Sequence, residues 1–247
     1  MDLSKPFERA AFEEIRRAFL AHRVVFFRGQ DITTGQHVAF ARLFGHLEIH
    51  PFATNKPGHP EVSVIRHGLE NRGHENTWQS DVTWRQAPSL GSVLRALEIP
   101  EVGGDTLFAD MQAAYLGLGD AMQRLLSGLT AIHDFVGVFG RGLTPAALAE
   151  MCAKYPAEHP VVRTHPETGH KGLYVNAAFT TGIKAMTHAE SSRAARAALP
   201  PGCRLFRWEK NAIAFWDNRA CPHHAVSDYW PKVRHMERVT IAGDRPF

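Results

Sequence analysis

Apolar residues near the start of the chain follow first a helical and then a strand-like pattern. Phe12, Ile15 and Phe19 recur at helical spacing among charged residues, which predicts an amphipathic helix that covers a core. The run 23–28 that follows is β-branched and aromatic and stops at Gly29. This run predicts a short buried strand.

A capping box at 33–36 predicts a second helix, which continues through Phe44 and ends at Gly45. Short apolar runs separated by turn residues dominate the rest of the chain. They predict strands over 61–66, 79–83, 92–99, 129–135, 160–165, 173–176, 204–208, 212–216 and 238–242. Helical patterns between them predict helices over 111–118, 121–127, 145–154 and 189–198.

The order of these elements predicts a mainly β protein with flanking helices. Strands and helices do not alternate regularly, which favours an antiparallel barrel or sandwich over a doubly wound sheet. With 44% hydrophobic and 21% charged residues, the composition is that of a chain that buries a core. No linker separates two halves, so we expect residues 1–247 to form a single domain.

Charge and composition narrow the expected partners and location. The 28 Lys and Arg against 25 Asp and Glu give a formal charge of +3, too little to indicate nucleic-acid binding without a basic cluster. The apolar runs 24–27 and 212–216 are too short to cross a bilayer. Cys152, Cys203 and Cys221 form no C-x-x-C pair, which excludes a disulfide framework and a cysteine zinc site. We expect a cytoplasmic protein without nucleic-acid or membrane partners.

Two segments carry candidate metal ligands. Gln79 and Asp81 lie two residues apart on the predicted strand 79–83, so their side chains point to one face and can reach the same ion. A second apolar strand is followed by the pair His223 and His224. A non-haem Fe(II) oxygenase needs two histidines and one carboxylate on one face of the metal. The two segments supply two of those three ligands, although each residue alone is more often structural.

Two arginines, Arg234 and Arg238, follow four residues apart before a β-branched run. Near a metal, such a pair can hold two carboxylates or other oxyanions through forked hydrogen bonds. Solvated surface charge is the alternative interpretation for either arginine alone.

Further motifs stand in a fixed order along the chain. They are Phe27-Arg28-Gly29-Gln30, Gly104-Asp105-Thr106-Leu107, Gly172-Leu173-Tyr174-Val175-Asn176, Trp216-Asp217-Asn218-Arg219 and Arg238-Val239-Thr240-Ile241. With these motifs, nearly the whole chain resembles the taurine dioxygenase and 2,4-D dioxygenase family of Fe(II)- and 2-oxoglutarate-dependent oxygenases. The resemblance implies a double-stranded β-helix, or jelly roll, with helices packed on one sheet and the active site in its mouth.

The resemblance also implies roles for individual residues. Asp81 and His223 match the iron carboxylate and the distal iron histidine of the family. Thr106 and Arg234 match the residues that hold the far carboxylate of 2-oxoglutarate. A fixed guanidinium suits a buried dicarboxylate, because an unpaired buried charge is very costly.

Three more positions match residues that bind the anionic head of the substrate. They are the side chains of His50 and Arg238 and the backbone of Val82. The resemblance therefore implies a small anionic organic substrate.

The first residue of the family's His-x-Asp motif is Gln79 in this chain. An amide oxygen can coordinate a divalent ion, but it lacks the imidazole nitrogen that suits Fe(II). We therefore expect Gln79 to be the third, weaker metal ligand, with weaker iron binding and lower activity. His67 and His74 are alternatives, but neither lies two residues from Asp81.

The resemblance implies a dioxygenase that uses Fe(II), 2-oxoglutarate and dioxygen to hydroxylate a sulfonate, sulfate ester or carboxylate. An alternative is an inactive member that binds 2-oxoglutarate or another anion, favoured by Gln79 and by a segment, 190–208, that is shorter than in the family. A hydrolytic zinc enzyme is less favoured, because zinc sites use more nitrogen or sulfur ligands. Family members are commonly dimers or tetramers, so we also expect a homo-oligomer.

Overall fold

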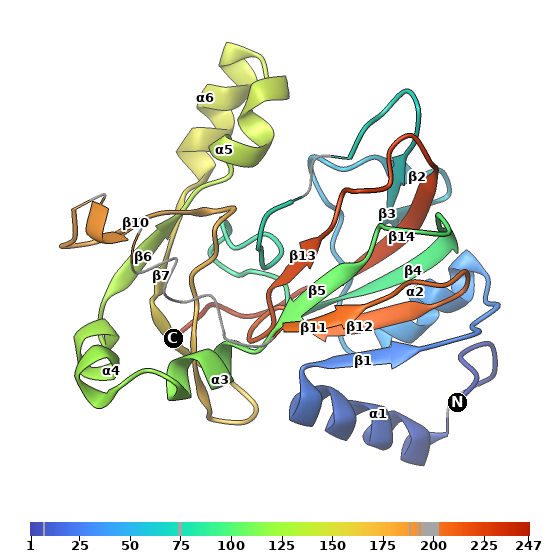
Figure 1. Cartoon of the computed structure of the whole chain (residues 1–247), viewed down its shortest axis with the longest axis horizontal. Coiled ribbons are helices and arrows are strands. Elements are labelled where there is room, and N and C mark those ends of the chain that lie inside the picture. The colour runs from blue at the N-terminus through green and yellow to red at the C-terminus, as the bar shows by residue number, and fades with distance from the viewer. Residues whose placement is uncertain (7, 74–75, 188, 192, 194–202) are drawn as a thin grey trace.

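A six-stranded antiparallel sheet is the largest part of the fold (Figure 1). The computed structural model describes residues 1–6, 8–73, 76–187, 189–191, 193 and 203–247. In spatial order the strands of the sheet are β1 (Val24–Phe27), β12 (Ile213–Asp217), β4 (Gly91–Glu98), β14 (Arg234–Ile241), β3 (His59–His67) and β2 (Asn55–Lys56). Non-consecutive strands are neighbours, so the sheet brings distant parts of the sequence together.

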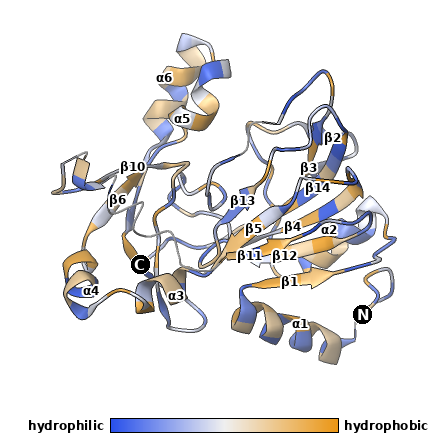
Figure 2. Ribbon diagram, in the orientation of Figure 1, coloured by the Kyte–Doolittle hydropathy of each residue, from blue (hydrophilic) through white to orange (hydrophobic). Residues whose placement is uncertain are grey.

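One face of this sheet is covered by two helices, α1 (Arg9–His22) and α2 (Thr34–Arg42). Phe215 on β12 is fully buried and stacks on Phe19 of α1, with 4.1 Å between the ring centroids. The predicted capping box is confirmed, because the Thr33 side chain accepts from the Gln36 amide and the Gln36 side chain accepts from Thr33. Figure 2 shows the apolar residues along β1, β4 and β12 that make this packing favourable.

A second sheet covers part of the other face. Its strands, in spatial order, are β11 (Cys203–Phe206), β5 (Thr106–Ala109) and β13 (His223–Ala225). Phe108 and Phe206 from this sheet share an apolar cluster with Leu94, Trp216 and Met236 of the large sheet. Two antiparallel sheets enclose a core, so the predicted sandwich is confirmed.

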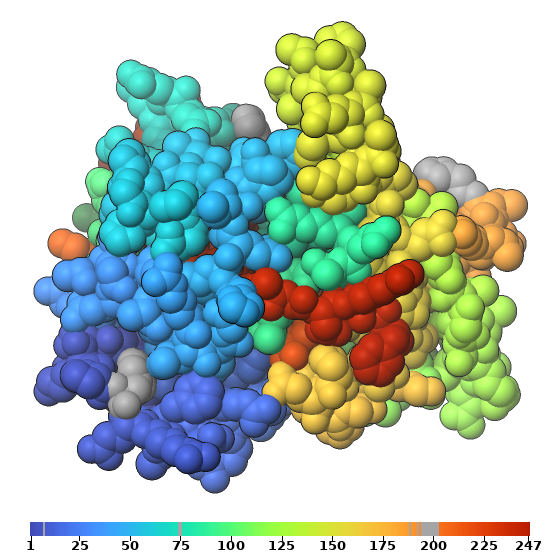
Figure 3. Space-filling model, turned by 180° about the vertical axis from the view of Figure 1, so that it is seen from behind, coloured from blue at the N-terminus to red at the C-terminus, as the bar shows by residue number. Residues whose placement is uncertain are grey.

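The remaining elements form a second group beside the sandwich (Figure 1). They are a sheet of β10 (Thr180–Ile183), β6 (Thr130–His133) and β7 (Ala157–Pro160), the pair β8 (Val162–Thr164) and β9 (Lys171–Leu173), helices α3 (Met111–Leu116), α4 (Asp120–Leu126), α5 (Val136–Phe139) and α6 (Pro145–Lys154), and a 3-10 turn η1 (Gly140–Gly142). The C-terminal tail crosses between the two groups (Figure 3), where Arg163 pairs with Asp244 at 2.8 Å. No helix of the described part of the chain is long and apolar enough to span a membrane.

The predicted strand 79–83 is wrong. Gln79 forms a single bridge with His223, and a turn begins at Asp81. Val82 in that turn has φ +50, which a strand does not allow. Strands β2, β5, β10 and β13 were missed, and β7 shares only Pro160 with the predicted strand 160–165, because these strands are short and acquire their pairing only from other strands. Most of the predicted helix 189–198 lies outside the described residues.

Candidate metal and anion site

Asp81 and His223 meet at the edge of the second sheet, because Gln79 is paired with β13. The Gln79 amide donates to the His223 carbonyl at 2.9 Å, and the His223 amide donates to the Gln79 carbonyl at 2.8 Å. The turn after Gln79 then carries the Asp81 side chain toward the His223 ring. A bridge at Gln79 followed by a turn therefore brings Asp81 close to His223, whereas the sequence predicted an unbroken strand over 79–83.

Three donor groups converge here. His223 Nε2 lies 4.0 Å from Asp81 Oδ1 and 3.3 Å from Gln79 Nε2. Ligand atoms lie about 2 Å from an ion, so atoms that share one ion lie within about 4 Å of each other. No three His, Cys, Asp or Glu residues of the described chain gather as a metal site, because the third group here is the amide of Gln79. The donor set offers a divalent cation two good ligands, Asp81 and His223, and the Gln79 amide can add a weak third ligand only through its oxygen.

The Asp81 carboxylate is held by three side chains from the large sheet and the loop that follows β12. Arg238 Nη1 donates to Oδ1 at 2.8 Å, while Ser92 Oγ and Asn218 Nδ2 donate to Oδ2 at 2.7 and 3.3 Å. Burial raises the pKa of Asp81, but the charges of Arg238 and His223 outweigh it and lower the pKa to about 2. Asp81 is therefore an anion at neutral pH.

His223 is a buried, neutral imidazole. Its ring packs against Trp216, with 4.7 Å between the ring centroids. Burial lowers the pKa of His223 to about 4. An amide nitrogen only donates hydrogen bonds, so the contact from Gln79 Nε2 makes His223 Nε2 the acceptor. The lone pair that a metal needs is thus directed toward Asp81 and Gln79.

His50 lies close enough to Arg238 and Asp81 for their charges to act on its ring. Burial and then the charge of Arg238 lower the pKa of His50 to about 3, so the ring is neutral at neutral pH. The Phe52 amide donates to His50 Nδ1 at 3.2 Å, which leaves Nε2 as the hydrogen-bearing nitrogen. His50 can therefore donate one hydrogen bond to an anion.

Thr106 and Arg234 lie on β5 and β14, away from the Asp81 carboxylate. The Thr106 hydroxyl accepts from Trp208 Nε1 at 2.9 Å. Arg234 is 4% exposed, and its Nε donates to the Gly104 carbonyl at 3.1 Å. Both side chains are buried polar groups, as expected of residues that hold a carboxylate.

The side chains of the two arginines contact different parts of the site. Arg234 and Arg238 are four residues apart on β14, which separates them by about 13 Å of strand. Arg238 reaches Asp81, whereas Arg234 reaches the loop before β5. His67 does not replace Gln79, because its Nδ1 lies 2.7 Å from the Tyr229 hydroxyl. His74 lies outside the described residues.

The sequence did not single out Ser92, Asn218 or Trp208. Ser92 lies on β4 among apolar residues, and no local signal identifies it. Asn218 is part of the Trp216 to Arg219 motif, and its Oδ1 accepts from the Asp81 amide at 3.2 Å and from Trp216 Nε1 at 2.9 Å. Membership of this motif was the sequence feature that could have pointed to Asn218 as a partner of Asp81.

Comparison with known proteins identifies the family. Residues 1–240 match the family described as Taurine catabolism dioxygenase TauD, TfdA family. The chain belongs to this family. An alpha-ketoglutarate-dependent sulfate ester dioxygenase of Pseudomonas putida is 35% identical, with 99% of this chain and 85% of that protein covered. An alkylsulfatase of Acinetobacter baylyi is 31% identical, with 98% and 80% covered.

A solved structure supports the same assignment. A taurine dioxygenase from Burkholderia xenovorans superimposes with a TM-score of 0.84 and 36% identity, covering 100% of this chain and 85% of that one. The expected jelly roll is thereby confirmed. TauD family members are dioxygenases that use Fe(II) and 2-oxoglutarate, so the expected enzyme class and cofactors are confirmed at the level of the family.

Proposed function

We propose that this chain hydroxylates a small organic anion in a reaction that consumes 2-oxoglutarate and dioxygen. The convergence of Asp81, His223 and Gln79 beside the Arg238 guanidinium supports the proposal most directly. A metal-binding triad next to a cation suits an anionic substrate better than a neutral one.

Asp81 and His223 would hold Fe(II) through Oδ1 and Nε2. Gln79 would complete the set through its amide oxygen, which faces the ion once the terminal amide turns over. When bound, Fe(II) supplies the centre at which 2-oxoglutarate and dioxygen react. Ser92 and Asn218 hold the other oxygen of Asp81 and so fix which oxygen the ion meets.

Thr106 and Arg234 would hold the far carboxylate of 2-oxoglutarate. The hydroxyl donates one hydrogen bond, and the guanidinium supplies a fixed positive charge inside the fold. Trp208 donates to the Thr106 oxygen, which leaves the hydroxyl hydrogen available to an anion.

Arg238, the neutral His50 ring and the backbone of Val82 would bind the anionic head of the substrate. The sulfate ester dioxygenase and the alkylsulfatase among the relatives support a sulfate ester as the first substrate to test. Hydroxylation at the carbon that bears the ester oxygen would release the sulfate.

A second candidate function is anion binding without catalysis. It is favoured by Gln79, because a neutral amide replaces an imidazole in the metal set. In this case 2-oxoglutarate would raise the melting temperature without any metal, by mass action.

An anaerobic titration with Fe(II) and then 2-oxoglutarate separates the two functions. We expect the unaltered chain to form the visible charge-transfer band of the chelated complex. Gln79→His should bind Fe(II) at least about tenfold more tightly, because even changes around metal ligands alter affinity by 10- to 100-fold. Gln79→Ala is the matched control, since it removes the amide without adding a ligand.

The unaltered chain and the two variants give distinct outcomes. A band in the unaltered chain that is lost in Gln79→Ala would make Gln79 a ligand. A band in Gln79→His alone would support the anion-binding function. No band in any of them, with all three folded, would contradict the proposed metal site.

Location and assembly belong to the same proposal. Three cysteines without a pairing pattern favour a reducing compartment, so we place the protein in the cytoplasm. We also propose a homo-oligomer, which size-exclusion chromatography with light scattering would test.

A further inference from the structure

The turn that carries Asp81 is hydrogen-bonded to the second group of elements through one of its own residues, Thr83. Thr83 is 1% exposed and lies on the side of the turn that faces the small sheet β10-β6-β7. Its hydroxyl oxygen lies 3.0 Å from His133 Nδ1 and accepts from Asn176 Nδ2 at 3.1 Å. Its carbonyl accepts from His159 Nε2 at 2.8 Å. Every polar side-chain or carbonyl group of this residue is therefore engaged.

The three partners are fixed by their own elements. His133 on β6 and His159 on β7 belong to paired strands, and both are almost fully buried. His159 Nε2 also lies 2.9 Å from the Arg85 carbonyl. Both of its partners are carbonyl oxygens, so Nε2 bears the hydrogen and donates to both.

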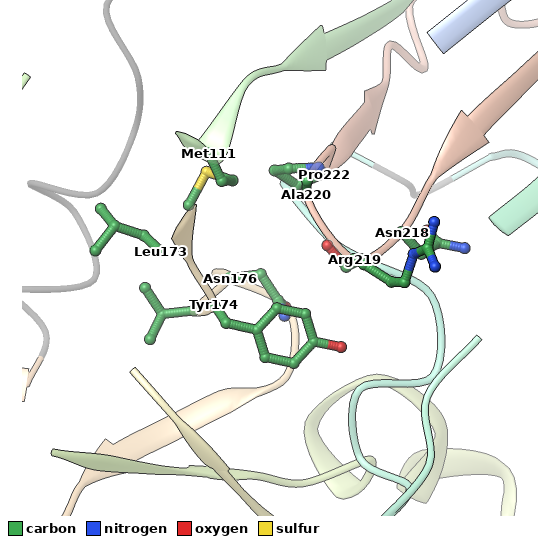
Figure 4. A pocket seen from close by; sticks show the side chains of 10 residues that line it. Met111, Leu173, Tyr174, Asn176, Asn218, Arg219, Ala220 and Pro222 are labelled. Atoms are coloured by element: carbon green, nitrogen blue, oxygen red, sulfur yellow. The ribbon is translucent and has the colours of Figure 1, made fainter. Parts of the chain in front are cut away.

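Asn176 reaches Thr83 from the loop after β9. Its Oδ1 accepts from the Phe179 backbone amide, and its backbone amide donates to the Thr180 hydroxyl, both at 2.9 Å. Asn176 also lines a narrow pocket with Ser80, and in this pocket Asn218 and Arg219 lie opposite Tyr174 (Figure 4). The second group of elements thus meets the sandwich at this turn.

The backbone of the turn is strained at Val82, so contacts from the surrounding elements are needed to hold it. Val82 is β-branched and has φ +50, a strained conformation that persists only where the surroundings enforce it. Arg238, Ser92 and Asn218 hold the Asp81 side chain from the sandwich, but none of them bonds Thr83. The hydrogen bonds to Thr83 hold the other end of the strained turn, together with the packing of Val82 and Trp84 against Phe135 and Phe179.

We infer that His133, His159 and Asn176 are positioning residues for the site, acting through Thr83 on the turn that carries Asp81 and Val82. The small sheet β10-β6-β7 is then the support of the metal carboxylate rather than an accessory. This inference rests on the proposed function for its effect on metal binding, but its effect on the turn does not require a metal.

The test compares Thr83→Val with Thr83→Ser, because both are close in size and only serine keeps the hydroxyl. Mn(II) affinity is measured by titration of the full chain, and hydrogen exchange is followed at the Arg85 amide, which donates to the Val82 carbonyl at 2.9 Å. We expect Thr83→Val to bind Mn(II) about 10- to 100-fold more weakly and to exchange faster at Arg85. Thr83→Ser should keep the Mn(II) affinity and the exchange rate at Arg85 of the unaltered chain.

Ile183→Val is the control for a loss of stability alone. Ile183 lies on β10 in the apolar cluster of the same group and does not contact Thr83 through a hydrogen bond in any described interaction. It should leave Mn(II) affinity and Arg85 exchange unchanged. Thr83→Val that loses stability but keeps both unaltered values would overturn the inference.

The test also covers a chain that binds no Mn(II) and a Thr83→Val variant that does not fold. If the unaltered chain binds no Mn(II), the proposed metal site fails, and faster Arg85 exchange in Thr83→Val alone still supports the role of Thr83 in the turn, whereas equal exchange overturns it. If Thr83→Val does not fold, His159→Leu and His159→Gln replace the pair, because glutamine keeps a donor and leucine removes it. The same two measurements then apply.

Discussion

At Gly104 the backbone conformation and the packing of a functional side chain depend on each other. Its φ is +73, and a Cβ at this position would lie 3.0 Å from Arg234 Cδ and 3.2 Å from Arg234 Nε. Its carbonyl accepts from Arg234 Nε, and its amide donates to Asp228 Oδ1 at 2.8 Å. The missing side chain therefore makes room for the arginine that we assign to 2-oxoglutarate.

We expect Gly104→Ala to weaken 2-oxoglutarate binding by about tenfold or more, since a shift of 1.4 kcal/mol in binding already has this effect. The cause is displacement of Arg234 by the added methyl group. Calorimetric titration with 2-oxoglutarate in the presence of Mn(II) measures the change.

Gly58→Ala is the matched control for that experiment. Gly58 has φ +78, but nothing lies within 4 Å of a Cβ there. Both variants should lose about 1–2 kcal/mol of stability from the left-handed backbone. Equal 2-oxoglutarate affinity in the two variants would contradict the role of Gly104.

At the scale of elements, a fully buried histidine of α2 makes a polar contact with the large sheet among the apolar contacts of the helix. His37 is fully buried, and its Nε2 donates to the Val93 carbonyl on β4 at 3.0 Å. Burial lowers the pKa of His37 from 6.5 to about 4. The helix is thus docked by a histidine that must stay neutral.

This contact predicts a pH dependence of stability. Between pH 6.5 and pH 4 the unfolded chain binds a proton at His37 and the folded chain does not. The free energy of unfolding is therefore undiminished by His37 above pH 6.5 and decreases as the pH falls toward 4. His37→Gln keeps a donor and removes the titration. Between pH 7 and 4.5 it should lose about 2–3 kcal/mol less stability than the unaltered chain, as measured by urea unfolding. Identical slopes for the two proteins would refute the prediction.

At the scale of the whole molecule, one arginine ties the sandwich to the second group of elements. Arg219 donates to both oxygens of Asp217 at 2.8 Å and to Glu167 Oε1 at 2.8 Å. Glu167 also contacts Arg16 on α1, and His165 Nε2 lies 2.9 Å from Asp217 Oδ2. That residues 1–247 form a single domain stays a prediction, and this network is the strongest reason to expect it.

We expect Arg219→Met to cost about 3–5 kcal/mol of stability, because it leaves the Asp217 carboxylate buried without its cation. Arg219→Met combined with Asp217→Asn should cost less than the sum of the two single changes, since the pair is coupled. Urea unfolding of the four proteins measures the coupling. Additive losses would show that Arg219 and Asp217 act independently.

Local sequence patterns specify the class of the fold, and the order of the motifs supplies the candidate residues of the site. Period-two and helical patterns, together with the capping box at Thr33, are local properties, so α1, α2, β4 and β12 were predicted near their observed positions. Asp81, His223 and Arg238 were predicted as site residues through the resemblance of several ordered motifs to one family. The structure brings these three side chains together.

How the proposed site is held depends on tertiary contacts that local sequence patterns do not reveal. The segment after Gln79 has the composition of a strand, but Val82 adopts φ +50 because contacts from two groups of elements outweigh its local preference. Ser92 and Thr83 gain their roles from residues up to 126 positions away in the sequence. Burial likewise sets the charge state of His223 and His50, since the cost of desolvation depends on the folded surroundings.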